Sequence, residues 1–359
     1  MLIIALCSLV AVFILAFALL RLIAPEIIRT SHKIKAPGID RMEMVEVGGI
    51  QQALYIRGQN ADNPVILWVH GGPGNSMMPL FHMFQYEWEN DFTVVHWDQR
   101  NVGKTYLAND PEAVLQTMSA ERVLDDVHEV TAYVKQRLNK EKIILMGHSW
   151  GTVLGTMAVQ TFPEDYSAYI GIAQVVNMAD NERAGYDNTL ELVKAAGNQK
   201  DIKVLEAIAP YPPAEYSSDY SELRTLRTLQ SKYGLSVNMN FGNIISLLAS
   251  PYYSFKELIN SAYFNQSKVV NAQGDVVRFL MEEADIRNYG TDFQVPVYYI
   301  MGENDYISPY LPTKEFFEEI VAPDKKIFFI QDADHMPFLS NKAEFDRILL
   351  EELSPKLAK

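Results

Sequence analysis

Residues 142–162 read KIILMGHSWGTVLGTMAVQTF, and this stretch decides the fold. The short apolar run at 142–147 predicts a buried strand, and the spacing from Trp150 to about Phe162 predicts a helix. Between them, GHSWG fits the pattern G-x-S-x-G, in which a strained turn exposes a serine hydroxyl and the glycines let strand and helix approach closely. An ordinary turn is the alternative, but the strand and helix on either side favour a nucleophile, Ser149.

Strands and helices alternate around this unit. Apolar runs at 65–70, 92–98 and 168–174 predict strands, and residues 119–139 have helical spacing. Two extended runs joined at Gly48-Gly49 predict a hairpin. Such alternation is typical of an α/β fold, with a mostly parallel sheet and helices on both of its faces.

The strand pattern stops after Gln174 and resumes at 295–302 and 326–330. Between these points, stretches such as Glu191–Ala209 and Ser221–Tyr233 have helical spacing, which predicts a helical insertion. A final amphipathic helix is expected from about Asn341 to Leu353. The expected organisation is a transmembrane anchor over residues 1–24, a juxtamembrane linker over 25–42, the first part of the core over 43–175, a helical cap over 176–290 and the second part of the core over 291–359.

The first 20 residues carry no charged side chain, and Leu2 to Leu20 is interrupted by one polar residue, Ser8. A helix of this length spans about 28 Å, close to the roughly 30 Å hydrocarbon core of a bilayer. We therefore expect a single-pass anchor that contacts the lipid bilayer through residues 2–20. A cleaved signal peptide, suggested by Ala16-Phe17-Ala18, and a buried core helix are the alternatives.

The basic residues near this segment all follow it; they are Arg21, Arg29, Lys33, Lys35 and Arg41. The positive-inside rule then places the catalytic domain in the cytoplasm. If the segment is a cleaved signal peptide, the protein is instead secreted.

Composition excludes several classes of protein. Lys and Arg number 31 against 45 Asp and Glu, giving a net charge of −14, which argues against a nucleic-acid partner. The single cysteine, Cys7, cannot form an intramolecular disulfide, and no cysteine cluster or ligand spacing points to a metal. We expect no cofactor.

A serine nucleophile needs a general base, and His335 is the one histidine that follows Ser149 in the sequence. It stands just after a predicted strand, where the sites of α/β proteins form. The acid expected to orient it is Asp305, which follows the strand at 295–302. Asp332 and Asp334 are rivals, but they are so close to His335 in sequence that the usual geometry is hard to achieve.

Acyl transfer also needs donors for a developing oxyanion. The backbone N–H of Trp150, at the start of the expected helix, supplies one. The second is expected from the loop HGGPG at 70–74, where three glycines allow backbone amides to turn toward a ligand. We favour Gly72 as this donor and expect Gly71 beside the substrate.

Several motifs, taken in this order, resemble the proline iminopeptidase branch of the serine α/β-hydrolases. They are HGGPG (70–74), DQRNVGKT (98–105), GHSWG (147–151), GEND (302–305) and the histidine of DHMPF (334–338). The resemblance covers residues 43–355. It implies an α/β-hydrolase fold with an inserted helical cap and a Ser-His-Asp hydrolase that releases an N-terminal residue, often proline, from peptides.

The chain departs from the family pattern in two places. Asn101 replaces a glycine and Thr105 a serine in the segment after DQR, and the cap lacks the tryptophan of the Trp-Glu pair expected in proline-specific enzymes. An aminopeptidase pairs the substrate ammonium with carboxylates. The candidates in the cap are Glu182, Glu282 and Glu283, and Asp180 beside them, although a solvated helix face is the alternative for each.

Three functions follow from these residues. The first is an aminopeptidase acting through an acyl-enzyme on a short peptide. The second is an esterase or general amidase that uses the same triad on a small apolar substrate. The third is a catalytically silent binding protein, against which the intact set of site residues argues. Epoxide hydrolases and dehalogenases of this fold use an aspartate nucleophile, so Ser149 argues against them.

Overall fold

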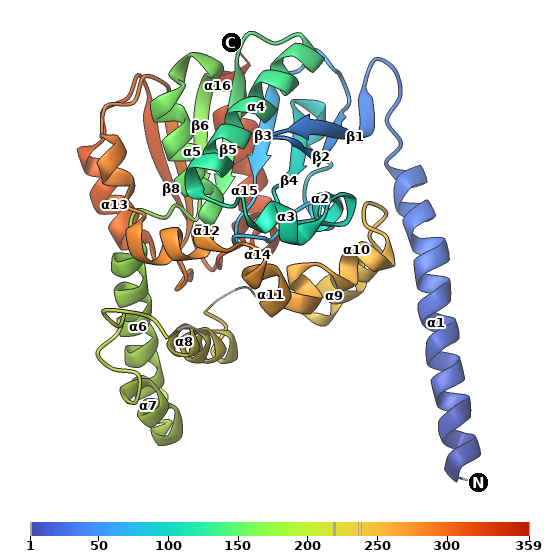
Figure 1. Cartoon of the computed structure of the whole chain (residues 1–359), viewed down its shortest axis with the longest axis vertical. Coiled ribbons are helices and arrows are strands. Elements are labelled where there is room, and N and C mark those ends of the chain that lie inside the picture. The colour runs from blue at the N-terminus through green and yellow to red at the C-terminus, as the bar shows by residue number, and fades with distance from the viewer. Residues whose placement is uncertain (1, 218–219, 236, 238, 359) are drawn as a thin grey trace.

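The structure is a computed structural model that describes residues 2–217, 220–235, 237 and 239–358. Within its first helix, side chains are described at positions 8 and 12 and from 15 onward. The centre of the molecule is an eight-stranded sheet with the order β1-β2-β4-β3-β5-β6-β7-β8 (Figure 1). Strand β2 pairs antiparallel with β1 and β4, and every later pair of neighbours is parallel. The predicted mostly parallel α/β sheet is therefore confirmed.

Apart from β1, which begins before the expected start of the core at residue 43, the strands begin and end within two residues of the runs expected from the sequence. Val47 pairs with Ile50 across the Gly48-Gly49 turn, which gives the predicted hairpin. The strands are β1 (Ile39–Val47), β2 (Ile50–Gly58), β3 (Val65–Val69), β4 (Thr93–Asp98), β5 (Ile143–His148), β6 (Tyr166–Ile172), β7 (Val297–Gly302) and β8 (Lys325–Ile330).

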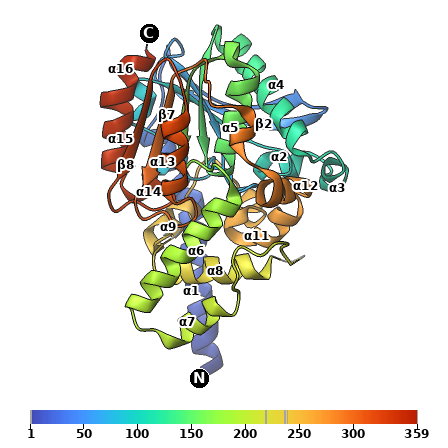
Figure 2. The same ribbon diagram turned by 90° about the vertical axis from the view of Figure 1, so that its left-hand side faces the viewer.

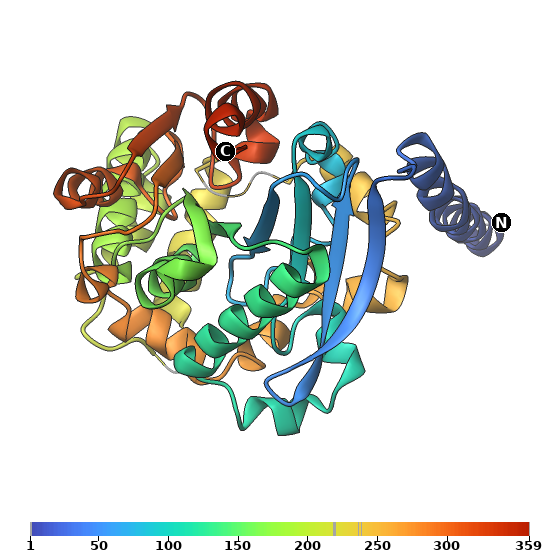
Figure 3. The same ribbon diagram turned by 90° about the horizontal axis from the view of Figure 1, so that it is seen from above.

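Helices cover both faces of the sheet, as Figure 3 shows from above. Successive strand residues point to opposite faces, so Leu145 lies in one buried cluster and its neighbours Ile144 and Met146 lie in the other. The helices of this core are α2 (Gly103–Ala108), α3 (Pro111–Leu115), α4 (Ala120–Leu138), α5 (Trp150–Thr161), α13 (Tyr310–Glu319), α14 (Pro337–Ser340), α15 (Lys342–Asp346) and α16 (Ser354–Leu357). The expected last helix is α15 followed by a π-helical segment, Arg347–Leu353.

The residues between β6 and β7 form helices that lie beyond the C-terminal ends of the parallel strands (Figure 2). An isolated bridge between Asn177 and Asp285 joins the two ends of this insertion. The helix expected at 191–209 is broken, because Gly197 has φ +68° and the Asn198 side chain caps a new helix. The helices of the insertion are α6 (Met178–Ala195), α7 (Gln199–Glu206), α8 (Ser221–Lys232), α9 (Phe241–Leu248), α10 (Phe255–Ile259), α11 (Ala262–Asn271), α12 (Asp275–Arg278) and the short helices Phe279–Glu283 and Ile286–Tyr289.

Helix α1 (Leu2–Ser31) stands beside the body of the molecule, with its N-terminus at the far end (Figure 1). The linker expected over residues 25–42 is shorter in the structure. Helix α1 continues through Pro25 to Ser31, and β1 already begins at Ile39. The Arg29 guanidinium donates to the carbonyl of Pro251 at 2.6 Å, which holds this last part of the helix against the cap.

The predicted membrane anchor falls largely on side chains that lie outside the described residues. In the part of the chain that the structure does describe, no helix combines the length and the apolar character needed to cross a membrane. The anchor over residues 1–24 therefore remains a prediction from the sequence.

Candidate active site

Ser149 lies in the sharp turn between β5 and α5. Its backbone has φ +53° and ψ −123°, which is a strained conformation for a residue with a side chain. A Cβ atom on Gly147 would lie 2.4 Å from the carbonyl oxygen of Gly151, and one on Gly151 would lie 2.0 Å from that of Val69. The two glycines are therefore required for the close packing that produces the turn, as the G-x-S-x-G pattern predicts.

His335 and Asp305 meet at the ends of β8 and β7. The Nδ1 atom of His335 lies 2.8 Å from Oδ2 of Asp305, and both side chains are buried. The other oxygen, Oδ1, accepts the backbone N–H groups of Ile307 and Ser308 at 2.9 Å each. The carboxylate is thus fixed in place, and the histidine ring presents its Nε2 atom away from it. Asp305, expected as the acid in preference to Asp332 and Asp334, is the residue that contacts His335.

His148 connects this pair to the serine turn. Its Nε2 atom lies 2.8 Å from the backbone carbonyl oxygen of His335, and the two imidazole rings are 5.0 Å apart. Burial, together with a smaller effect of the neighbouring His335, lowers the pKa of His148 to about 3. The ring is therefore neutral and donates its Nε2–H to the carbonyl. His148, which directly precedes the candidate nucleophile Ser149, therefore fixes the loop that carries the candidate base His335.

The glycine-rich loop after β3 lies against Ser149. A Cβ atom on Gly71 would lie 3.0 Å both from the Cβ of Ser149 and from the carbonyl oxygen of His148. Gly72 has φ +114° and Gly74 has φ +99°, backbone conformations that favour glycine. The loop expected to supply an oxyanion donor is thus beside the serine, and its path depends on its glycines.

Gln99 joins the two elements on which the oxyanion donors were predicted. Its side-chain amide donates to the carbonyl oxygen of His70 at 3.0 Å, and its backbone N–H donates to Nε2 of the same histidine at 3.3 Å. Its Oε1 atom accepts the indole N–H of Trp150 at 3.3 Å. Sequence reasoning missed this buried residue, although the DQR motif at the end of β4 contained the signal.

Asp98, the first residue of that motif, joins the sheet to the cap. Its carboxylate accepts the Tyr253 hydroxyl at 2.6 Å and the backbone N–H of Lys104 at 2.7 Å, and it also accepts the Ser76 hydroxyl. Burial raises the pKa of Asp98 to about 6, an effect that these hydrogen bonds oppose. Tyr253 lies between α9 and α10, so this contact fixes that part of the cap above the end of β4.

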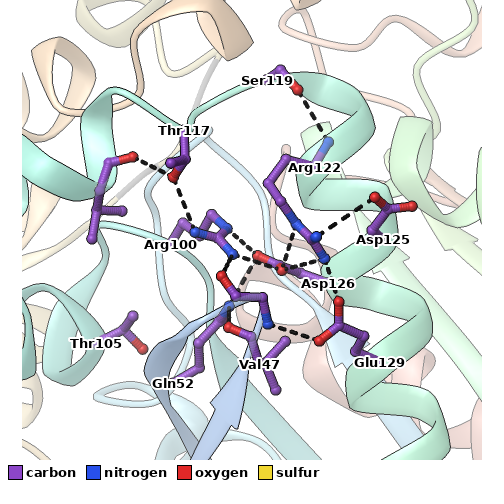
Figure 4. Close-up of polar contacts among 12 residues, drawn as sticks. Val47, Gln52, Arg100, Thr105, Thr117, Ser119, Arg122, Asp125, Asp126 and Glu129 are labelled. Atoms are coloured by element: carbon purple, nitrogen blue, oxygen red, sulfur yellow. Dashed lines mark hydrogen bonds and ion pairs between the residues drawn. The ribbon is translucent and has the colours of Figure 1, made fainter.

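Arg100 forms a buried ion pair with Asp126 of α4 (Figure 4). It also donates to the carbonyl of Gly48 at 2.7 Å, in the β1–β2 hairpin. Gln52 donates to the same carboxylate at 2.9 Å, and Arg122 contacts it from the preceding turn of α4. The third residue of the motif therefore fixes a helix and a hairpin to the edge of the core.

The two departures from the family pattern in this segment have structural explanations. Asn101 has φ +55°, a conformation that asparagine tolerates better than most residues other than glycine. The Thr105 hydroxyl donates to the carbonyl of Asp98 at 2.6 Å and accepts the N–H of Ala53 at 3.0 Å, as a serine hydroxyl could.

Glu182, a candidate for binding the substrate amine, is buried within the cap. Its Oε2 atom accepts the Tyr211 hydroxyl at 2.6 Å, and its Oε1 atom forms an ion pair with Arg227 of α8. Each carboxylate oxygen thus has a partner inside the protein, and a substrate ammonium group would compete with Arg227 for it.

Glu282 and Glu283 lie next to each other on the short helix Phe279–Glu283, and both are exposed. Glu283 forms an ion pair with Arg278 one turn earlier. Asp180 likewise pairs with Arg183 and Arg287 at the surface. These contacts are what a solvated helix face would give, and a role of the two glutamates in substrate binding stays a prediction.

A cavity of about 280 Å³ lies between the cap and the loop that carries His335. Asn304, Asp334 and Met336 form one wall, and cap residues that include Gly234 and Asn240 form the other. Because Asn304 precedes Asp305 and the other two flank His335, the cavity adjoins the candidate pair. Among the described residues, no group of three or more His, Cys, Asp or Glu side chains could hold a metal ion.

Residues 64–342 match the family model for the alpha/beta hydrolase fold. The chain belongs to this family. It is 26% identical over 315 residues to a probable aminopeptidase, YbaC, of Bacillus subtilis (strain 168), an alignment that covers 86% of this chain and 94% of the relative. The resemblance to proline iminopeptidase-type α/β-hydrolases expected from the motifs is thereby confirmed, and the chain is a hydrolase of this fold.

Two solved structures illustrate the range of activities built on this hydrolase fold. The proline iminopeptidase of Mycobacterium smegmatis superposes with a TM-score of 0.60 at 17% identity, covering 89% of this chain and 99% of that one. The epoxide hydrolase VrEH1 of Vigna radiata superposes with a TM-score of 0.55 at 16% identity, covering 88% and 98%. At such identities the likeness establishes the fold, and the chemistry must be argued from the site.

Proposed function

We propose that this α/β-hydrolase is a serine aminopeptidase with Ser149 as nucleophile, His335 as general base and Asp305 as the residue that orients the base. The observation that carries the proposal is the 2.8 Å contact between His335 and Asp305, in a loop that His148 ties to the strained serine turn. The serine in the turn also distinguishes the site from one with an aspartate nucleophile at that position.

The steps follow from the positions of these groups. The Ser149 hydroxyl attacks the scissile carbonyl carbon, and its proton passes to Nε2 of His335. Asp305 stabilises the imidazolium that forms, and the backbone N–H groups of Trp150 and Gly72 stabilise the oxyanion. When the carbon–nitrogen bond breaks, Nε2 gives its proton to the leaving amine. A water molecule, deprotonated by His335, then hydrolyses the acyl-enzyme and frees Ser149.

The choice of substrate rests on the relatives and on the cap. A relative that aligns with 86% of this chain is named a probable aminopeptidase, which favours a short peptide with a free N-terminus. An esterase or general amidase acting on a small apolar substrate is the second candidate. It is favoured by the contacts of Glu182, whose two oxygens already bind Tyr211 and Arg227.

Two measurements test the proposal. A fluorophosphonate probe should label the wild type and fail to label Ser149→Ala, whereas Ser267→Ala, at an exposed cap position, should label normally. Absence of labelling in folded wild-type protein would refute the serine mechanism. The remaining hypothesis would then be a catalytically silent binding protein. Rates on aminoacyl anilides with free and with blocked amines then distinguish an aminopeptidase from an esterase or general amidase. Equal rates on the two substrates would rule out the aminopeptidase.

For location, we propose that residues 2–20 anchor the chain in a bilayer with the catalytic domain in the cytoplasm. The support is the uncharged apolar sequence and the basic residues that follow it, Arg21 and Arg29 among them. Flotation of the full chain with vesicles tests the anchor, and protease treatment of intact cells tests the orientation. A chain found in the medium without its first residues would support secretion instead.

A further inference from the structure

We propose that the face of the cap formed by α9, α10 and α11 rests on the surface of the bilayer next to the N-terminal anchor. This inference depends on the anchor proposed above and extends it from the helix to the folded domain. The residues of this lipid-facing patch are Phe241, Ile244, Phe255, Ile259 and Phe264.

The patch consists of large apolar side chains that the fold leaves in contact with solvent. Phe241 is 79% exposed, and the other four side chains are each at least 40% exposed. Single exposed apolar residues are ordinary, but several on neighbouring short helices mark an interaction surface. The three helices lie together on the side of the body that faces the N-terminal end of α1 (Figures 1 and 2).

Charge distinguishes this part of the cap from the rest of the chain. Between positions 233 and 274 the sequence holds three charged residues, Lys256, Glu257 and Lys268, in a protein whose net charge is −14. Glu257 forms an ion pair with Lys104 at 2.8 Å, so its charge is compensated. Lys256 and Lys268 are exposed and add positive charge beside the apolar side chains. Apolar residues with basic neighbours suit an anionic bilayer surface.

Contacts with α1 set the level of the patch relative to the anchor. The ring of Phe17 packs edge-on against that of Phe255, with centroids 5.2 Å apart. One turn later, Arg21 donates to the carbonyl oxygens of Ser250 and Tyr253 at 3.2 and 2.9 Å. The apolar stretch ends at Leu20, so these contacts hold the patch at the depth where the anchor leaves the bilayer.

A second set of exposed apolar side chains lies on α1. Leu15, Leu19, Ile23 and Ile27 follow one another at intervals of four, on one face of the helix, and each is at least 46% exposed. This stripe runs past the contact with Phe255. At 100° per residue these side chains point away from Phe17 and Arg21, which contact the cap. The free side of the helix and the patch beside it are thus both apolar and both open to the lipid around the anchor, which favours one bilayer as the occupant of both over an unrelated partner protein.

The test measures where single positions lie relative to lipid, in the full chain with Cys7→Ala as background. Phe255→Cys and Phe264→Cys place a fluorescent label in the patch. Val321→Cys is the matched control, because Val321 is 63% exposed and pairs with Asp292 before the start of β7, at the opposite end of the strands from the cap. The labelled chains are reconstituted in phosphatidylcholine–phosphatidylserine vesicles that contain a nitroxide lipid.

We expect the nitroxide lipid to quench the two patch labels at least about twofold more than the Val321 label, because an interfacial helix is buried by some 5–10 Å. Aqueous iodide should show the reverse order. If the chain floats with the vesicles but the patch labels behave like the control, the anchor stands and this inference is wrong. Labels shielded from iodide yet not quenched by the lipid would show that a second copy covers the patch, which also overturns it. A chain that does not float refutes the anchor and the inference together.

Discussion

The Nε2 atom of His148 donates to the backbone carbonyl of His335 at 2.8 Å, and this contact joins the serine turn to the loop of the candidate base. The contact requires a neutral His148, which burial ensures by lowering its pKa to about 3. His335 in turn contacts Asp305. The three strand ends that carry Ser149, Asp305 and His335 are therefore held together by buried hydrogen bonds, a preorganised arrangement suited to acyl transfer.

Replacing the site residues should abolish most of the activity. Ser149→Ala and His335→Ala are each expected to lower kcat by about 10⁴- to 10⁶-fold, and Asp305→Asn by about 10⁴-fold because the ring loses its orienting carboxylate. The measurement is steady-state kinetics on an activated ester or anilide. Asp332→Asn, at the rival acid, serves as the control and should keep its rate. An Asp305→Asn enzyme with wild-type kcat would mean that the acid is assigned wrongly.

Gln99 is a positioning residue whose loss should slow the reaction without preventing it. Gln99→Leu removes the side-chain hydrogen bonds to the His70 carbonyl and the Trp150 indole and keeps the backbone bond to Nε2 of His70, so the spacing of the two oxyanion donors is less firmly fixed. We expect kcat to fall by about 10- to 100-fold with little change in KM, since a displaced donor weakens stabilisation of the transition state. Labelling of Ser149 by the fluorophosphonate should persist at a lower rate. If kcat falls only in proportion to the fraction of protein that is folded, the role of Gln99 is purely structural.

Gly151→Ala should destabilise the fold, because its Cβ would lie 2.0 Å from the carbonyl oxygen of Val69. The backbone on both sides must move, at a cost of about 1–3 kcal/mol or more in the free energy of unfolding. Denaturant unfolding measures the change. Gly242→Ala is the matched control, because its Cβ would meet no backbone atom and alanine favours the α9 helix. A Gly151→Ala protein as stable as the control would contradict the packing described for the turn.

Arg100→Met should leave the buried carboxylate of Asp126 without its main partner (Figure 4). Breaking a buried ion pair in this way costs about 3–5 kcal/mol of unfolding free energy. The double variant Arg100→Met with Asp126→Leu removes the uncompensated charge and should recover part of that loss. If the single and double variants were equally unstable, the penalty would come from lost packing rather than from the unpaired charge.

The contribution of the buried histidines to stability should fall as the solution is acidified from about pH 6.5 to pH 4. Burial lowers the pKa of His96 to about 3 and that of His70 to about 4, so between these values and the usual 6.5 the unfolded chain binds protons that the folded chain does not. Each such histidine therefore lowers the unfolding free energy as pH falls, by up to about 1.4 kcal/mol per pH unit, whereas the raised pKa of Asp98 acts in the opposite direction. His96→Asn should make the dependence of the unfolding free energy on pH shallower by up to about 1.4 kcal/mol per pH unit. An unchanged slope would show that His96 titrates alike in both states.

Local sequence was enough to predict most of the strands, the serine turn and the pairing of His335 with Asp305. Each of these depends on short-range features: an apolar run, the glycines beside Ser149, or a polar residue directly after a strand. The expected helix at 191–209 was wrong at Gly197, where a single residue with positive φ ends one helix and Asn198 begins another. The extent of α1 beyond Pro25 was also missed, because a proline in sequence usually marks a boundary.

The sequence by itself therefore determined the alternation of strands and helices and the order of the chemical groups, because periodicity and turn chemistry are local properties of the chain. Only the tertiary structure decided that Gln99 bridges His70 and Trp150, that Arg227 occupies a carboxylate oxygen of Glu182, and that Phe17 meets Phe255. These pairs are far apart in sequence and follow no period. Their partners are selected by which side chains the folded sheet and cap bring within contact distance, and burial then makes those contacts strong.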